Sequence, residues 1–170
     1  MPQPWRLVLP LAIALCATTP AGAGAASGGW PWPVVGPVLR GFELPVGPYG
    51  AGHRGIDIAV TEGTQVRAPA PGVVSFAGRV GGQLFVTLDH GGGLQSTYSW
   101  LSAALVRKGD AVAVGAPIAL SGLGHPGSTI AHLHFGVKFG GNYVDPMLYL
   151  SPGSVVNLIR LAPILATGAT

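Results

Sequence analysis

The stretch STIAHLHFGV (residues 128–137) carries two of the chain's five histidines, separated by a single leucine. In a β-strand, residues two apart project from the same face, so His132 and His134 share one face. Leu133 and Phe135 lie on the opposite face, which is apolar and suits a protein core. The alternation therefore predicts a strand that packs one side on the core and presents two imidazoles on the other.

Short β-prone runs of a similar kind recur along the chain from about Arg40 onwards. Turn residues such as EG, PG, GG, GGG and KGD separate them roughly every ten residues, as is typical of all-β domains. No segment keeps a convincing helical period over about twelve residues. The sequence therefore predicts an all-β fold, a single antiparallel β-sandwich or open barrel, with a domain spanning residues 38–152.

The composition supports one turn-rich β domain. Charged residues make up 9% of the 170 residues, against about 25% in typical proteins. Glycine (28) and proline (16) are plentiful, and the apolar fraction of 48% argues against a disordered chain. Lysine and arginine are scattered and form no patch, so we expect no nucleic-acid partner.

Residues 1–25 have the features of a secretory signal peptide. One arginine precedes the apolar stretch LVLPLAIALCA, and small-residue cleavage sites follow it. That stretch is too short to span a bilayer comfortably, so we expect no stable membrane insertion after cleavage; the alternative is an uncleaved anchor. Cys16, the single cysteine, leaves with the signal, and the mature protein then has no disulfide. The expected location is extracytoplasmic: secreted, in the cell wall or in the periplasm.

Two further segments flank the predicted domain. Residues 26–37 are rich in proline, glycine and tryptophan and are expected to form a linker that enters the domain. Residues 153–170 form an apolar C-terminal tail whose pattern fits a strand, a short helix or a frayed end.

A second polar face is predicted in the segment HRGID, residues 53–57. His53 and Asp57 are four residues apart and share a face of a strand. Asp57 lies between Ile56 and Ile58, where burying an unpaired carboxylate costs several kcal/mol. A metal ion resolves this, because two imidazole nitrogens and one carboxylate oxygen suit Zn²⁺. Three protein ligands leave a fourth position for water, the pattern of a catalytic site.

Each of these signals is weak alone. Surface histidines are more common than metal ligands, and His53 could simply pair with Asp57. Together, in a chain with so few charges, the two segments favour a metal site. Two other histidines are less informative: His90 precedes a glycine turn and is expected to be structural, whereas His125 lies in the loop before the H-x-H strand, where it is either solvated or reaches the site.

The succession of motifs resembles the lysostaphin/LytM-type metallopeptidases, peptidoglycan hydrolases with the duplicated hybrid motif. The resemblance covers about residues 48–148 and is carried by GHRGIDIAV, GTQVRAPAPGVV, VTLDHGGG, TYSWL, GDAVAVGAPI and HLHFGV. It implies a small antiparallel β-sandwich with a metal in a groove across one sheet. It also implies cleavage of peptide bonds in the stem or cross-bridge of bacterial peptidoglycan.

The resemblance implies that Zn²⁺ is bound by His53, Asp57 and His134. His132, the first histidine of H-x-H, would be a catalytic histidine that orients or deprotonates the attacking water. In some relatives a residue upstream of the first ligand fills the open metal position in a latent form. No Asn or Asp lies between the signal and His53, so we expect this position to be open.

One motif departs from the family pattern. Fully active members usually carry Tyr-x-His-Leu where this chain reads Tyr98-Ser99-Trp100-Leu101. An indole N–H donates a hydrogen bond but cannot accept a proton, so Trp100 cannot act as a base. Trp100 and Tyr98 are instead expected to contact the substrate. Losing an acid–base group typically lowers a rate by about 10² to 10⁴.

Two functions are compatible with these residues: a zinc endopeptidase weakened by Trp100, and an inactive module of the same fold that binds wall peptides or regulates another wall hydrolase. A third class is a biotinyl or lipoyl carrier, whose small β domains resemble VRAPAPGVVSFAG and RKGDAVAVGAPIAL. Carriers need a lysine at a hairpin tip, and neither Lys108 nor Lys138 lies in such a context.

Overall fold

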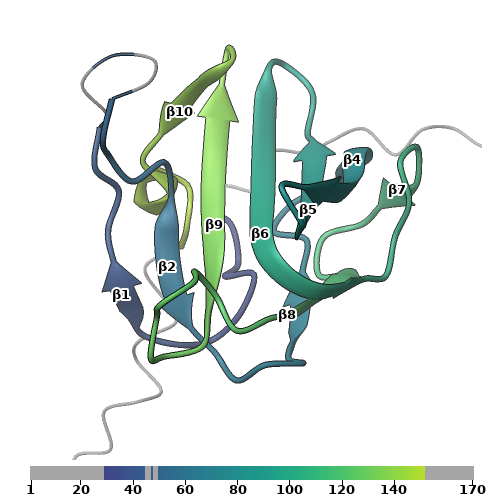
Figure 1. Ribbon diagram of the computed structural model, residues 1–170. Helices are drawn as coiled ribbons and strands as arrows, with labels where there is room; N and C mark the ends of the chain where they lie inside the picture. The colour runs from purple at the N-terminus through teal and green to yellow at the C-terminus, as the bar shows by residue number, and fades with distance from the viewer. Residues whose placement is uncertain (1–28, 45–46, 48–49, 152–170) are drawn as a thin grey trace, which may run out of the picture.

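The computed structural model describes residues 29–44, 47 and 50–151 and places them mainly in antiparallel strands (Figure 1). The expected signal peptide, the first residues of the expected linker and the apolar tail lie outside this range. The described elements are β1 (Val38–Arg40), β2 (Ile56–Ala59), β3 (Gln65–Arg67), β4 (Gly72–Val80), β5 (Gln83–Asp89), β6 (Leu94–Ala104), β7 (Ala111–Val112), β8 (Pro117–Ser121), β9 (His132–Phe139), β10 (Asn142–Val144) and a 3-10 turn, η1 (Pro146–Leu148).

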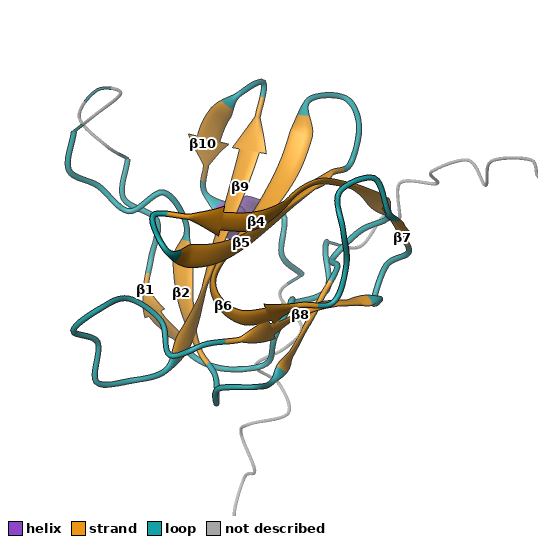
Figure 2. Ribbon diagram, turned by 45° about the vertical axis from the view of Figure 1, so that its right-hand side comes forward, coloured by secondary structure: helices purple, strands orange, loops and turns teal. Residues whose placement is uncertain are grey.

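The strands form one open sheet in the order β1-β2-β9-β6-β5-β4-β7. β10 extends the sheet beside β9, and β8 joins β3 to the end of β6. Every pairing between these strands is antiparallel. The β4–β5 hairpin curls away from the flat part of the sheet (Figure 2). The predicted all-β class and open antiparallel architecture are confirmed. Within the described ranges, no helix is long and apolar enough to cross a bilayer.

The core follows from the alternation in β2 and β9. Their register sets Ile56 opposite Phe135 and Ile58 opposite Leu133, and all four side chains are fully buried. Burying each of these side chains contributes about 1.5–3 kcal/mol relative to leaving it exposed. The residues between them face the other way, so the same apolar pattern fixes where the polar side chains project.

Part of the expected linker packs against the domain. The backbone N–H of Trp30 donates to the carbonyl of Tyr149 at 2.6 Å, and the indole N–H of Trp32 donates to the carbonyl of Ser151 at 3.0 Å. Val34 is buried in the core cluster. These contacts tie residues 30–34 to the C-terminal end of the described domain.

β6 changes partners at Trp100. Residues 94–99 pair with β9, whereas residues 101–104 pair with β8, and β6 is visibly curved where it turns toward β8 (Figure 1). Trp100 has a φ of 63°, which a bulky residue adopts only at a cost. The bend therefore breaks the two-residue alternation of β6 at the position where the family pattern usually has a histidine.

His90 is held by a buried polar network, in agreement with its expected structural role. Its Nδ1–H donates to the carbonyl of Pro71 at 2.8 Å, and Nε2 lies 2.8 Å from Oγ of Ser96. The Ser96 hydroxyl also meets the Tyr98 hydroxyl at 2.9 Å, and the Trp30 ring packs on the imidazole at 4.9 Å. Burial lowers the pKa of His90 and so favours its neutral form.

This network predicts a pH effect on stability. Because the folded pKa of His90 is depressed, its contribution is complete above the ordinary value of 6.5 and is lost as the pH falls from there through the folded pKa. Between pH 7.5 and about 5, the wild type should therefore lose more unfolding free energy than a His90→Gln variant. Urea unfolding of both proteins at each pH measures this, and equal losses would contradict it.

Candidate metal centre

The polar faces of β2 and β9 meet in register. Asp57 is directly opposite His134, and Ala59 is opposite His132. His53 lies just before β2, where its backbone bridges to Glu43. The structure thus brings together His53, Asp57 and His134, the set that the family resemblance implies, from segments about eighty positions apart in the sequence.

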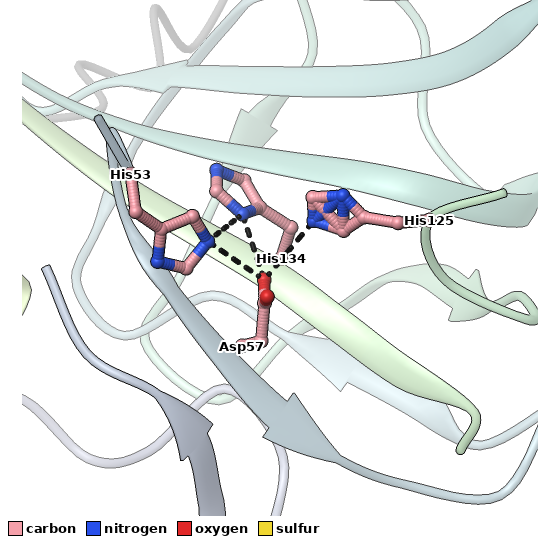
Figure 3. Close-up of side chains that lie close together, drawn as sticks. All are labelled: His53, Asp57, His125 and His134. Atoms are coloured by element: carbon pink, nitrogen blue, oxygen red, sulfur yellow. Dashed lines mark hydrogen bonds and ion pairs between the residues drawn. The ribbon is translucent and has the colours of Figure 1, made fainter. Parts of the chain in front are cut away.

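Three donor atoms converge on one point (Figure 3). Nδ1 of His134 lies 2.8 Å from Oδ1 of Asp57, and Nε2 of His53 lies 3.1 Å from the same oxygen. The two ring nitrogens are 3.0 Å apart. A tetrahedral zinc ion with bonds of about 2.0–2.1 Å separates its ligand atoms by about 3.3 Å. The three atoms therefore need to open by only a few tenths of an ångström to hold one ion.

The protonation pattern of His53 also favours a cation. Its Nδ1 lies 2.6 Å from the carbonyl of Gly41, which accepts only from a protonated nitrogen. A neutral His53 therefore directs the lone pair of Nε2 toward the carboxylate of Asp57, another acceptor. A positive ion between the two removes this repulsion, and the carbonyl of Gly41 is the type of outer partner that orients a ligating histidine.

Asp57 is buried, with 6% of its surface exposed. Burial opposes its ionisation, but the hydrogen bond from His134 and the charges of the surrounding imidazoles outweigh burial and lower the pKa of the carboxyl. Asp57 is therefore in its anionic, ligating form at neutral pH.

A fourth residue reaches the cluster. Nε2 of His125 lies 3.4 Å from Oδ1 of Asp57, and the ligand atoms of His53, Asp57, His125 and His134 all lie within 4.8 Å of one another. Partial burial lowers the pKa of His125, the neighbouring histidines lower it further and Asp57 opposes the shift. The sequence left open whether His125 is solvated or reaches the site, and in the structure it reaches the site.

His132 lies beside this group on β9 and is almost fully buried, with 3% exposed. Its Nδ1–H donates to the carbonyl of Ile130 at 2.8 Å, which leaves Nε2 as the acceptor. The backbone N–H of His125 donates to that Nε2 at 3.2 Å. In this tautomer Nε2 of His132 is the nitrogen that can accept a proton, but it already accepts the hydrogen bond from the backbone of His125.

The two residues expected to contact substrate lie in different places. Tyr98 is fully buried, with its ring 5.4 Å from Phe135, so it cannot touch a bound peptide and that prediction is wrong for Tyr98. Trp100 instead faces the site, and its ring centroid is 4.9 Å from that of His125. Positions 98 and 100 would share a face of a regular strand, but the bend at Trp100 separates them.

A groove of about 470 Å³ leads away from the cluster. One wall comes from the β4–β5 hairpin and the other from β9 and β10. Lys138 brings a positive charge into it, with Nζ 4.6 Å from the centre of the Tyr143 ring. The lining also includes His53, Arg54, Phe76, Val80, Phe85, Thr97, Ser99, Trp100, His125 and His134.

Comparison with known proteins places this geometry in context. The model of peptidase family M23 matches residues 51–146. An uncharacterized protein of Mycobacterium tuberculosis is 36% identical over 170 residues, which cover 97% of this chain and 66% of that protein. The murein hydrolase activator NlpD of Salmonella typhimurium is 33% identical over 123 residues, 71% of this chain and 31% of that protein. The chain thus spans less than two thirds of the length of these curated relatives.

Two solved structures share the fold. A zinc-containing peptidase from Vibrio cholerae superposes with a TM-score of 0.60 at 29% identity, over 70% of this chain and 39% of that one. The catalytic domain of lysostaphin from Staphylococcus simulans gives a TM-score of 0.57 at 30% identity, over 66% of this chain and 90% of that one. Both agree with the resemblance seen in the sequence motifs.

Proposed function

Because the chain belongs to peptidase family M23, we propose that it is a zinc endopeptidase that acts on the peptide cross-links of bacterial peptidoglycan outside the cytoplasm. The observation that carries this proposal is the convergence of His53, Asp57 and His134 beside a groove, with His132 two residues from His134 on β9. The signal-like residues 1–25 support the location.

In this proposal each residue of the site has a distinct task. His53, Asp57 and His134 hold the ion. Bound zinc would supply a Lewis acid that polarises a peptide carbonyl and lowers the pKa of water. The hydrogen bond from Nδ1–H of His132 to the carbonyl of Ile130 keeps the proton of the neutral ring on Nδ1. Nε2 can then take up a proton once the backbone N–H of His125 no longer donates to it.

The groove supports a peptide as the substrate class. It is open rather than a closed pocket, and its β4–β5 wall carries apolar side chains, those of Phe76, Val80 and Phe85. Lys138, held over Tyr143, places a cation where the carboxylates of a wall peptide can bind. We therefore expect Lys138 to favour peptides that carry a carboxylate.

The proposal is tested on purified peptidoglycan. Zinc-loaded protein is expected to release new amino termini from the wall, and removal of the metal by a chelator should abolish this release. A Trp100→His variant restores an acid–base group and is expected to raise the rate, by up to about 10² to 10⁴. Absence of cleavage by both zinc-loaded proteins, and by versions of both that carry His125→Ala beside the ligands, would rule out the peptidase function.

A second function is favoured by Trp100, which cannot accept a proton in the place of the usual histidine. The chain would then bind wall peptides in the groove and activate another wall hydrolase, as the name of the Salmonella relative says of that protein. In that case, wild-type protein accelerates wall digestion by an added hydrolase but releases no amino termini alone.

A further inference from the structure

His125 lies between two aromatic rings and points at the metal ligands. Its ring centroid is 4.9 Å from that of Trp100 on one side and 4.9 Å from that of His132 on the other. The His132 ring is stacked on it, at an interplanar angle of 28°. His125 therefore fills the space between the position of the replaced histidine and the remaining catalytic histidine. In Figure 3 it reaches the cluster from the side opposite His53.

Two glycines allow the backbone on the N-terminal side of His125 to pass close to Trp100 and His132. Gly124 has a φ of +89°, and a side chain there would collide with the ring of His132. Gly122 donates its N–H to the carbonyl of Trp100 at 2.9 Å, and a side chain at Gly122 would strike that carbonyl. The loop that joins β8 to β9 is thus fixed at both the bend of β6 and the start of β9.

We propose that His125 is the fourth protein ligand of the zinc ion, so that the β8–β9 loop closes the metal centre in the resting protein. This inference rests on the proposed function, because it concerns the same ion. The sequence led us to expect an open fourth position on the metal; in this proposal the imidazole of His125 fills it.

His125 lies within reach of a four-ligand centre: the four ligand atoms lie within 4.8 Å of one another, so its ring needs to move inward by up to about 1.5 Å to complete a tetrahedral set. Nε2 of His125 lies 3.4 Å from Oδ1 of Asp57, close to the spacing of about 3.3 Å between ligands on a tetrahedral zinc ion. Its ring is also set edge-on to that of His134, at 84°, so the two imidazoles approach the common point from different directions. Sites in which protein supplies all four ligands are closed to water and substrate.

The same residue also blocks the catalytic base. While His125 stays in place, its backbone N–H occupies Nε2 of His132, the atom that must accept a proton. Displacing the loop therefore frees the metal position and the base together. The His125 side chain is 34% exposed, against 8% for Asp57, so it is the member of the cluster that can leave without opening the core.

Nuclear magnetic resonance of wild-type protein labelled with ¹⁵N-histidine tests the proposal directly. On addition of one equivalent of Zn²⁺, three imidazoles, those of His53, His125 and His134, are expected to show a metal-bound nitrogen. A His125→Ala variant should show two, and its zinc affinity should fall by about tenfold or more, since even outer partners of a ligand contribute about 10- to 100-fold. A His90→Gln variant, which removes an imidazole outside the cluster, should bind zinc like the wild type.

Activity provides a second readout, since His125→Ala is expected to cleave wall peptides faster than the wild type. Wild-type protein that binds zinc through only two histidines, with an affinity unchanged by His125→Ala, would overturn the inference and leave the proposed function intact. A His125→Ala variant that keeps wild-type zinc affinity but cleaves more slowly would also overturn it, in favour of a catalytic role. Wild-type protein that binds no zinc would instead refute the proposed function itself.

Discussion

Replacing Asp57 with asparagine is expected to remove zinc from the protein. The amide keeps the shape of the side chain but loses the negative charge that neutralises the ion and faces the nitrogens of His53 and His134. Changing an outer partner of a metal ligand lowers affinity by about 10- to 100-fold, so loss of a charged ligand should exceed about 100-fold. Competition with a chromophoric chelator measures the affinity, and elemental analysis gives the bound metal per chain.

The stability of the same variant gives an independent check. Zinc stabilises whichever state binds it, so its addition should raise the melting temperature of the wild type but not of Asp57→Asn. Asp110→Asn is the matched control, because Asp110 accepts a hydrogen bond from the backbone of Arg107 in an exposed turn. If Asp57→Asn retained wild-type zinc affinity, the assignment of the metal site would be wrong.

Replacing His132 with alanine is expected to lower the rate of peptide cleavage by about 10² to 10⁴ while leaving bound zinc unchanged. His132 is the acid–base group that remains beside the ligands, since Trp100 cannot accept a proton. The variant is compared with wild type by the release of amino termini from purified peptidoglycan, with zinc content measured in both.

The result separates the two proposed functions. A peptidase loses cleavage in His132→Ala, whereas a module that only binds peptides and activates a partner keeps its effect on that partner. The comparison should be repeated with His125→Ala as the parent protein, in which the imidazole no longer occupies the fourth metal position. Equal cleavage rates with and without His132 in both backgrounds would exclude His132 from catalysis.

Much of the architecture could be predicted because alternation is a local property of the chain. Two alternating segments predicted strands with polar outer faces, one from apolar side chains at 56 and 58 and one from apolar side chains at 133 and 135. Both strands are present. Which strand pairs with which is a non-local property. The direct pairing of Asp57 with His134 therefore required the structure, although the family resemblance implied that the two side chains meet.

The site predictions were weakest where the backbone is irregular. Tyr98 and Trp100 share a face only if β6 is regular, and the positive φ of Trp100 breaks that condition. His125 lies in a loop, where no periodicity indicates the direction of a side chain. The packing of Trp30 on Tyr149 was equally hidden, because a segment rich in proline and glycine gives no signal for long-range contacts.

The change of partner in β6 has a consequence for how this molecule can vary. The carbonyl of Trp100 anchors the loop at Gly122, and its indole supports the imidazole of His125. A substitution at this single position leaves the backbone carbonyl in place, but it alters proton-transfer chemistry and the ring packed against His125 together. A histidine at position 100 would therefore add an acid–base group beside the ligands and remove the indole that supports His125, both through one substitution.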